Sequence, residues 1–225
     1  DGFGNSLVFG PDNVSRLYDN LKFIHGLGFS NIYFLPRLYE QWNRQDLKIL
    51  ESQFKKIGRY YISLFSDKKK EKPFVIPYLY RHIEARNSKS FYCDKLNMDW
   101  RGDLFRCWAF LSLDDATRKR FRLDMRNFNK SDMAFRKNFF IPAVRLYEKL
   151  SGKNITESVF CPVDAHVHAI LYNEDFKKTM TNFIKIAKLY QTLFRSIIYR
   201  LARNRRFIAP YSGAINKHPK IEYYC

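Results

Sequence analysis

Two cysteines near the middle of the chain have the spacing of a metal-binding hairpin. The segment FYCDKLNMDWRGDLFRCWAF (residues 91–110) places eight residues between Cys93 and Gly102 and four between Gly102 and Cys107. Residues 91–98 and 103–111 are rich in β-forming side chains, and DWRG between them supplies Asp99 and Gly102 for a turn. On paired antiparallel strands the two thiolates form half of a tetrahedral sulfur site, which suits zinc or an iron-sulfur cluster.

A third sulfur can join this pair from a later part of the chain. Cys161 is followed by Pro162 and comes after a segment with the pattern of a helix. A loop that returns to the hairpin after that helix makes Cys161 a natural third ligand. Three unrelated buried thiols are the alternative, and a chain of this size needs no disulfides for stability. The sequence therefore predicts Cys93, Cys107 and Cys161 as metal ligands and offers no catalytic side chain.

Two histidines beside Cys161 offer a second kind of site. His166 and His168 can join the cysteines around zinc, because thiolate and imidazole are both common zinc ligands. On a strand the two side chains share a face, whereas on a helix they point about 200° apart and cannot bind the same ion. Hydrogen bonding at a helix start or in a loop is the other role open to them.

Other patterns that carry chemistry are weak or missing. Asp114 and Asp115 are adjacent and point apart on a strand, so they suit a turn cap better than an acid–base pair. The sequence contains no glycine-rich phosphate loop and no nucleophile elbow. Aromatic residues and arginines are interleaved in FRSIIYRLARNRRF (residues 194–207), which suits stacking on bases, but a helix with an aromatic core face and a basic solvent face has the same spacing.

The first 65 residues have the pattern of alternating strands and helices. Residues 6–10 and 31–36 are short apolar runs, and residues 11–28 between them have helical spacing with Asp12 or Asn13 as the cap. A second amphipathic helix over residues 43–65 begins with Asn43 as its cap. This order predicts a βαβ unit with parallel strands. Because such a unit cannot cover both faces of its own sheet, we expect it to be the end of a larger α/β layer.

The remainder of the chain predicts a smaller domain of helices around the hairpin. Residues 66–73 are a charged break, and a short helix follows Pro77. Residues 114–127 predict a loop that returns to a short strand, and residues 131–152 predict a helix that begins at Ser131 and ends at Gly152. The strongest helical pattern runs from Phe176 to about Arg203, and the aromatic, basic tail after it has no periodicity.

The charge of the chain indicates an anionic partner or a solvated basic surface. The net charge is +18 and the isoelectric point is about 9.8, but Lys and Arg are spread along the whole sequence. No run of apolar residues is long enough to span a membrane, and the polar start lacks the features of a secretory signal. We therefore expect a cytoplasmic protein that makes no membrane contact.

The order cysteine, glycine, four residues, cysteine resembles the auxiliary-cluster domains, called SPASM or twitch, of radical S-adenosylmethionine enzymes. The segment MDWRGDLFRCWAFLS (residues 98–112) is similar to the hairpin of that family, and residues 11–42 are similar to the late βα units of its barrel. The order of partial barrel, helix, cysteine hairpin, helix and FCP before a long helix is also the family's order. The resemblance covers about residues 6–195.

The resemblance implies a fold, a cofactor and a class of substrate. The expected fold class is α/β plus α+β, in which the last βα units of a partial TIM-like barrel (residues 1–68) precede a small auxiliary domain of a β-hairpin and helices (residues 69–205). An irregular basic tail (residues 206–225) would follow. Cys93, Cys107 and Cys161 would hold an auxiliary [4Fe-4S] cluster, and Cys225, Asp94, a histidine, substrate or solvent would supply the fourth ligand.

The same resemblance limits what this chain can do alone. The three-cysteine motif that holds the cluster which cleaves S-adenosylmethionine is absent from the sequence. S-adenosylmethionine would be a cofactor only if the missing half of the barrel is supplied. The expected function is therefore that of a C-terminal part of a radical S-adenosylmethionine enzyme that binds a peptide or protein substrate for modification. The alternative is a basic module without catalysis that binds nucleic acid and has a structural zinc or no metal.

Overall fold

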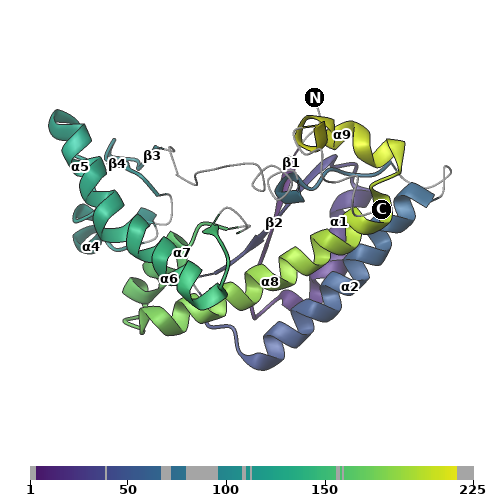
Figure 1. Ribbon diagram of the computed structural model, residues 1–225, viewed down its shortest axis with the longest axis horizontal. Helices are drawn as coiled ribbons and strands as arrows, with labels where there is room; N and C mark the ends of the chain where they lie inside the picture. Colours follow the sequence, from purple (N-terminus) through teal and green to yellow (C-terminus); the bar gives the residue numbers. More distant parts are fainter. Residues whose placement is uncertain are drawn as a thin grey trace. The chain divides into compact units, whose positions relative to one another are not determined.

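The computed structural model describes residues 4–38, 40–66, 72–79, 96–107, 110–111, 113–155, 158 and 160–216. These residues form mostly helices with two small sheets, as Figure 1 shows. The chain divides into two compact units: the first comprises Asp1–Lys89, Thr156–Val159 and Lys185–Cys225, and the second comprises Ser90–Ile155 and Phe160–Ile184. The expected mixture of helices and strands is confirmed, and the expected domain boundaries at residues 68 and 205 stay predictions.

The first unit begins with the expected βαβ arrangement. Strand β1 (Gly4–Phe9) is followed by the short helix η1 (Val14–Arg16), helix α1 (Leu17–Gly26) and strand β2 (Asn31–Pro36). The two strands are parallel, with Leu7 opposite Phe34. Asn13 lies at the N-cap position of η1, as predicted, but its side chain forms no capping bond there and instead accepts a hydrogen bond from the Gly10 backbone N–H at 2.9 Å.

The β1–β2 sheet is buried on one face. Leu7, Phe9, Ile32 and Phe34 alternate along the strands and are all buried, whereas Val8 and Tyr33 on the opposite face are 50% and 38% exposed. The Phe9 ring contacts Trp42, Phe54 and Tyr190 at centroid distances of 6.1, 6.4 and 6.4 Å. Helices thus cover one face of this parallel sheet, and the other face has apolar side chains exposed.

Two long helices complete the packing of the first unit. Helix α2 (Arg44–Ser66) begins at Asn43, whose side chain accepts hydrogen bonds from the Gln45 and Asp46 N–H groups, so the predicted cap is confirmed. The first unit also contains residues 185–201 of helix α8 (Phe176–Leu201), which confirms the strongest helical pattern. A Cβ at Gly58 of α2 would lie 3.1 Å from Leu193 Cδ1 of α8, so glycine permits the close approach of these helices.

The expected irregular tail is wrong for its first half. Residues Arg205–Asn216 form helix α9, and residues 217–225 lie outside the described part of the chain. The helix begins where the Asn204 side chain accepts a hydrogen bond from the Arg206 N–H. Phe207 and Tyr211, one turn apart, are both buried. The proline at position 210 hides this short amphipathic pattern in the sequence.

The second unit contains the expected hairpin in a shorter form. Strands β3 (Asn97–Met98) and β4 (Leu104–Phe105) are antiparallel. The Asp99 carboxylate accepts hydrogen bonds from the Arg101 and Asp103 N–H groups, and Gly102 has a φ of +84°, so both predicted turn residues shape the reversal. Residues 91–95 lie outside the described residues, and the second strand ends at Phe105 and not at residue 111.

Helices form the rest of the second unit. They are α4 (Asp115–Lys119), η3 (Met125–Asn127), α5 (Phe128–Phe135), the π-helical turn η4 (Arg136–Phe140), α6 (Ile141–Ser151), α7 (Val163–Leu171) and the first nine residues of α8. The predicted strand within residues 114–127 was wrong: residues 120–124 are irregular, but Asp114 accepts a hydrogen bond from the Thr117 N–H and caps the short helix α4. Ser131 is no cap, since α5 begins at Phe128, but Gly152 ends α6 with a φ of +67°, as predicted.

The helices of the described residues differ in length and in apolar character. Within those residues, no helix combines the length and the apolar character that crossing a membrane requires.

Candidate functional site

Two of the three predicted sulfur ligands lie in the described part of the second unit. These are Cys107 and Cys161. The third, Cys93, lies outside the described residues, and so do two candidates for a fourth ligand, Asp94 and Cys225. The surroundings of Cys107 and Cys161 are therefore described below. The complete set of three cysteine ligands stays a prediction.

Cys107 follows the hairpin and is not part of its strand. It lies two residues after the end of β4 and is buried, with 7% of its surface exposed. Its backbone carbonyl accepts a hydrogen bond from the Phe110 N–H at 3.2 Å, so the chain turns directly after the cysteine. The expectation that Cys107 lies on a paired strand was wrong, because the antiparallel pairing ends at Phe105.

Cys161 lies immediately before a helix. Pro162 is the residue that precedes α7, and the Cys161 carbonyl accepts a hydrogen bond from the Asp164 N–H at 3.2 Å. Cys161 is partly exposed. Cys107 and Cys161 thus share a local setting, in which each is followed by a tight turn that its own carbonyl closes.

A cluster of phenylalanines joins the segments that follow the two cysteines. We call Phe110, Phe121, Phe135 and Phe139 the phenylalanine cluster. The Phe110 ring stacks on Phe121 with centroids 4.4 Å apart and contacts Phe139 at 5.8 Å. Phe139 in turn lies 5.3 Å from the ring of His166 in α7. The turn after Cys107 and the helix after Cys161 therefore pack on the same aromatic core.

Asp164 is a buried acid that the sequence analysis did not single out. Although the residue is partly exposed, its Oδ1 atom is buried and accepts no hydrogen bond from any described residue. Burial raises the pKa of Asp164 to about 7. A buried carboxylate oxygen without a donor requires a proton or a cation nearby. No signal in the sequence predicts this, because the burial comes from tertiary packing.

The two histidines lie on one helix, which excludes the zinc site that uses both. His166 and His168 belong to α7, where two residues apart means about 200° around the axis. His166 stacks on Phe176 with centroids 4.2 Å apart, and burial lowers its pKa. His168 lies with Nε2 3.7 Å from a Glu174 carboxylate oxygen. The two side chains therefore have separate surroundings.

The described residues hold no site for a single metal ion. No three side chains of His, Cys, Asp or Glu in this part of the chain lie close enough to bind one ion together. Each cysteine of a cubane cluster binds a different iron, so its ligands lie farther apart than the donors to one ion. With Cys93 outside the described residues, Cys107 and Cys161 are the described thiols that could each bind one iron of such a cluster, and Asp164 is a carboxyl group with an unsatisfied oxygen.

A network of ion pairs, also missed in the sequence, fixes the hairpin within the second unit. Arg106, directly before Cys107, is buried, and its Nε lies 2.5 Å from Asp132 Oδ1 of α5. Arg136 Nε donates to the other oxygen of the same carboxylate at 3.0 Å. At the turn, Arg118 of α4 lies 3.6 Å from Asp99. These contacts hold the backbone on both sides of the β-turn and next to Cys107.

Comparisons with known proteins identify no relative. No family model, no curated protein and no solved structure matches the chain. The geometry of the residues themselves therefore carries the functional argument.

Proposed function

We propose that the chain is the C-terminal part of a radical S-adenosylmethionine protein and that its second unit binds an auxiliary [4Fe-4S] cluster. Cys93, Cys107 and Cys161 are the proposed ligands. The observation that carries the proposal is the phenylalanine cluster, because it packs the turn after Cys107 and the helix after Cys161 against one another through Phe139 and His166. Two cysteines distant in sequence thus lie in segments that share one core.

The first unit supports the proposed end of a partial TIM-like barrel. Its two strands are parallel and are joined by a helix, and among the described residues helices pack on one face of the sheet while Val8 and Tyr33 on the other face are exposed. In a barrel the outer face packs on helices and the inner face packs on side chains from other strands. The exposed Val8 and Tyr33 would belong to that inner face.

The residues around the proposed cluster define what it would do. A bound cluster would supply a site for one-electron transfer, tuned by burial and by hydrogen bonds to its sulfur atoms. The buried position of Cys107 and the adjacent phenylalanine rings would restrict water at this site. The unsatisfied Asp164 oxygen, one helical turn beyond Cys161, is suited to donate to the site as a carboxyl or to bind it as a carboxylate. The proposed substrate is a peptide or protein.

Anaerobic reconstitution with iron and sulfide tests the cluster. We expect a broad absorption band near about 400 nm and about four irons per chain. Cys107→Ser and Cys161→Ser should each lose most of the iron, because each removes a thiolate ligand. Met133→Ser, which changes an exposed sulfur residue of the same unit, is the matched control and should keep it. Zinc in place of iron, or no metal in the unaltered protein, would contradict the proposal.

A further inference from the structure

The tip of the β3–β4 hairpin exposes large apolar side chains. Trp100 is 82% exposed, Met98 is 65% exposed and Leu96 is 48% exposed. The Arg101 guanidinium lies over the Trp100 ring, 4.5 Å from its centroid, so the indole has a cation on one side. Single exposed apolar residues are common, but here three lie at alternate positions of one short segment, before, in and after β3.

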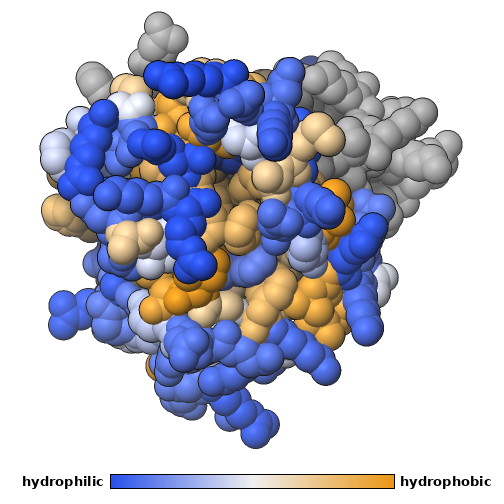
Figure 2. Space-filling model, turned by 90° about the vertical axis from the view of Figure 1, so that its left-hand side faces the viewer, coloured by the Kyte–Doolittle hydropathy of each residue, from blue (hydrophilic) through white to orange (hydrophobic). Residues whose placement is uncertain are grey.

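More exposed apolar side chains lie on the elements next to this hairpin. Met125 of η3 is 58% exposed and Met133 of α5 is 69% exposed. A backbone hydrogen bond joins β4 to the segment before η3, since the Leu123 N–H donates to the Leu104 carbonyl at 2.8 Å. The ion pair between Arg106 and Asp132 joins the hairpin to α5 beside Met133. Figure 2, which views the molecule from the left-hand side of Figure 1, shows orange apolar side chains among blue hydrophilic ones.

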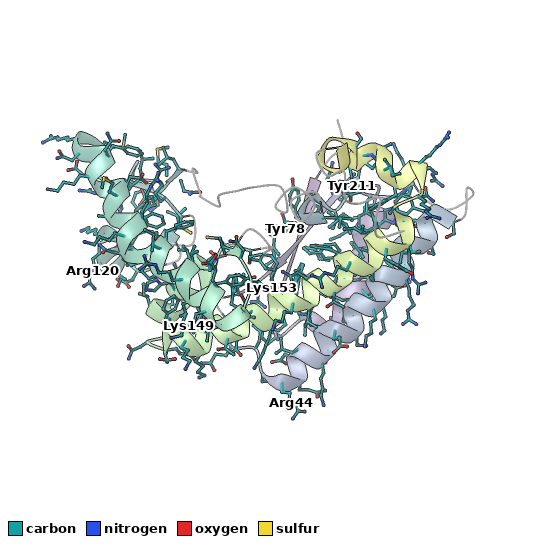
Figure 3. All side chains as sticks on the ribbon, viewed as in Figure 1. Arg44, Tyr78, Arg120, Lys149, Lys153 and Tyr211 are labelled. Atoms are coloured by element: carbon teal, nitrogen blue, oxygen red, sulfur yellow. The ribbon has the colours of Figure 1, made fainter. Side chains whose placement is uncertain are left out.

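The same elements have more cationic than acidic side chains, so some of the cations have no acidic partner among the described residues. Residues 96–137 contain ten Lys and Arg and six Asp, which gives a net charge of +4. All six acids are engaged: Asp99, Asp103, Asp115 and Asp132 in ion pairs, and Asp114 and Asp124 as caps. Five cations of this segment have no acidic partner among the described residues: Lys119, Arg120, Arg126, Lys130 and Lys137. Figure 3 labels Arg120 at the end of α4, on this unit.

We infer that this surface, made of Leu96, Met98, Trp100, Met125, Met133 and the five unpaired cations, binds an acidic polypeptide segment that carries apolar side chains. Apolar side chains of the partner would pack on the tryptophan and the methionines, whose flexible thioethers adapt to varied shapes. Its carboxylates would meet the cations that the second unit leaves unpaired. The inference concerns this surface alone and does not depend on a bound cluster.

The composition of the surface favours a polypeptide over a single-stranded nucleic acid. Stacking on bases needs several exposed aromatic rings along a basic groove, and this surface has one, Trp100. Its other apolar groups are three methionines and a leucine, which pack on aliphatic and aromatic side chains but offer no ring for a base. A nucleic acid would use only the cations of this surface.

Fluorescence anisotropy with a labelled synthetic peptide of Glu, Asp, Leu and Phe tests the inference on the full chain. We expect saturable binding in moderate salt, and binding about tenfold weaker or worse for Trp100→Ala and for Arg126→Glu combined with Lys130→Glu. Met98→Ser is a second apolar variant, so that the test does not rest on one substitution. Tyr199→Ala, at a 73% exposed position of the first unit, is the control and should bind as the unaltered protein does.

Two probes separate this partner from others. The same peptide with Lys in place of Glu and Asp should not bind, and an oligo(dT) strand should not displace the acidic peptide. Equal binding of both peptides, no binding of the acidic one, or displacement by oligo(dT) with loss in the same variants would each overturn the inference. The last result would assign the surface to nucleic acid, with a steep dependence on salt.

Discussion

The hydroxyl groups of Tyr61 and Tyr211 lie 3.1 Å apart in the core of the first unit, although the two residues are 150 positions apart in the sequence. Tyr61 donates to the Phe74 carbonyl at 3.0 Å, and the Tyr211 oxygen accepts a hydrogen bond from the Ile76 N–H at 2.8 Å. The pair thereby joins α2, α9 and the segment that contains Phe74 and Ile76. Figure 3 shows Tyr211 at α9.

Tyr211→Phe should lower the free energy of unfolding by about 1–3 kcal/mol, because it leaves the Ile76 N–H without an acceptor in a buried site. Urea denaturation at neutral pH measures this change. Tyr199→Phe removes a hydroxyl from a largely exposed residue and should change the free energy by less than about 0.5 kcal/mol. Equal effects of the two substitutions would show that the buried hydrogen bonds do not stabilise the fold.

Alkaline pH should weaken the first unit through the same pair. Burial raises the pKa of Tyr211 from 10.0 to about 12, and burial also raises the pKa of Tyr61. Because the unfolded chain loses these protons near pH 10 and the folded chain retains them to higher pH, the stabilisation is full below pH 10 and falls as the pH rises toward about 12. Each such group contributes a slope of about 1.4 kcal/mol per pH unit in that window. Urea midpoints between pH 9 and 11.5 should fall less steeply in Tyr211→Phe.

Asp132→Ala should destabilise the second unit by about 3–5 kcal/mol, because it leaves the buried Arg106 guanidinium without its carboxylate. Adding Arg106→Met should recover part of this loss, since the uncompensated charge is then removed. Glu51→Gln breaks an exposed pair with Lys55 and should change stability by less than about 1 kcal/mol. Thermal unfolding of these three variants and of the unaltered protein measures the difference. A small effect of Asp132→Ala would mean that the Arg106 guanidinium becomes solvated when its carboxylate partner is removed.

Gly102→Ala should lower the free energy of unfolding, whereas Gly26→Ala should leave it unchanged or raise it. Gly102 has a φ of +84°, so alanine there should cost about 1 kcal/mol although no atom lies within 4 Å of the added Cβ. Gly26 ends α1, also with no atom near the added Cβ, and alanine should be neutral or stabilise by up to about 1 kcal/mol. Denaturant midpoints of both variants measure this. A loss of similar size at both sites would rule out the backbone argument.

The sequence predicts those elements whose signal is local and repeated. The βαβ order and the helices α2 and α8 follow from apolar periodicity and, at Asn43, from a cap that its own side chain forms. Helices α4 and α9 were missed because the first is only five residues long and the second contains Pro210. Their formation depends on caps at Asp114 and Asn204 and, for α9, on the burial of Phe207 and Tyr211.

The candidate site was predictable only in part, because only some of its features have a local signal in the sequence. The spacing around Gly102 identifies a hairpin before Cys107, but it does not reveal that pairing ends at Phe105. The helical state of His166 and His168, which excludes a shared ion, was left open by their spacing. The burial of Asp164 and the pairing of Arg106 with Asp132 arise from contacts between distant segments, which no local pattern encodes.

The division of the chain within α8 has a consequence for how the protein is made. The second unit is an insertion into the first, because residues of the first unit both precede and follow it. The core around Phe9 includes Tyr190, so it cannot close until the ribosome has released most of the chain. The second unit is fully synthesised earlier, by residue 184. During translation the inserted unit should therefore fold first. The apolar face of β1 and β2 is buried only after the C-terminal part of α8 has been synthesised.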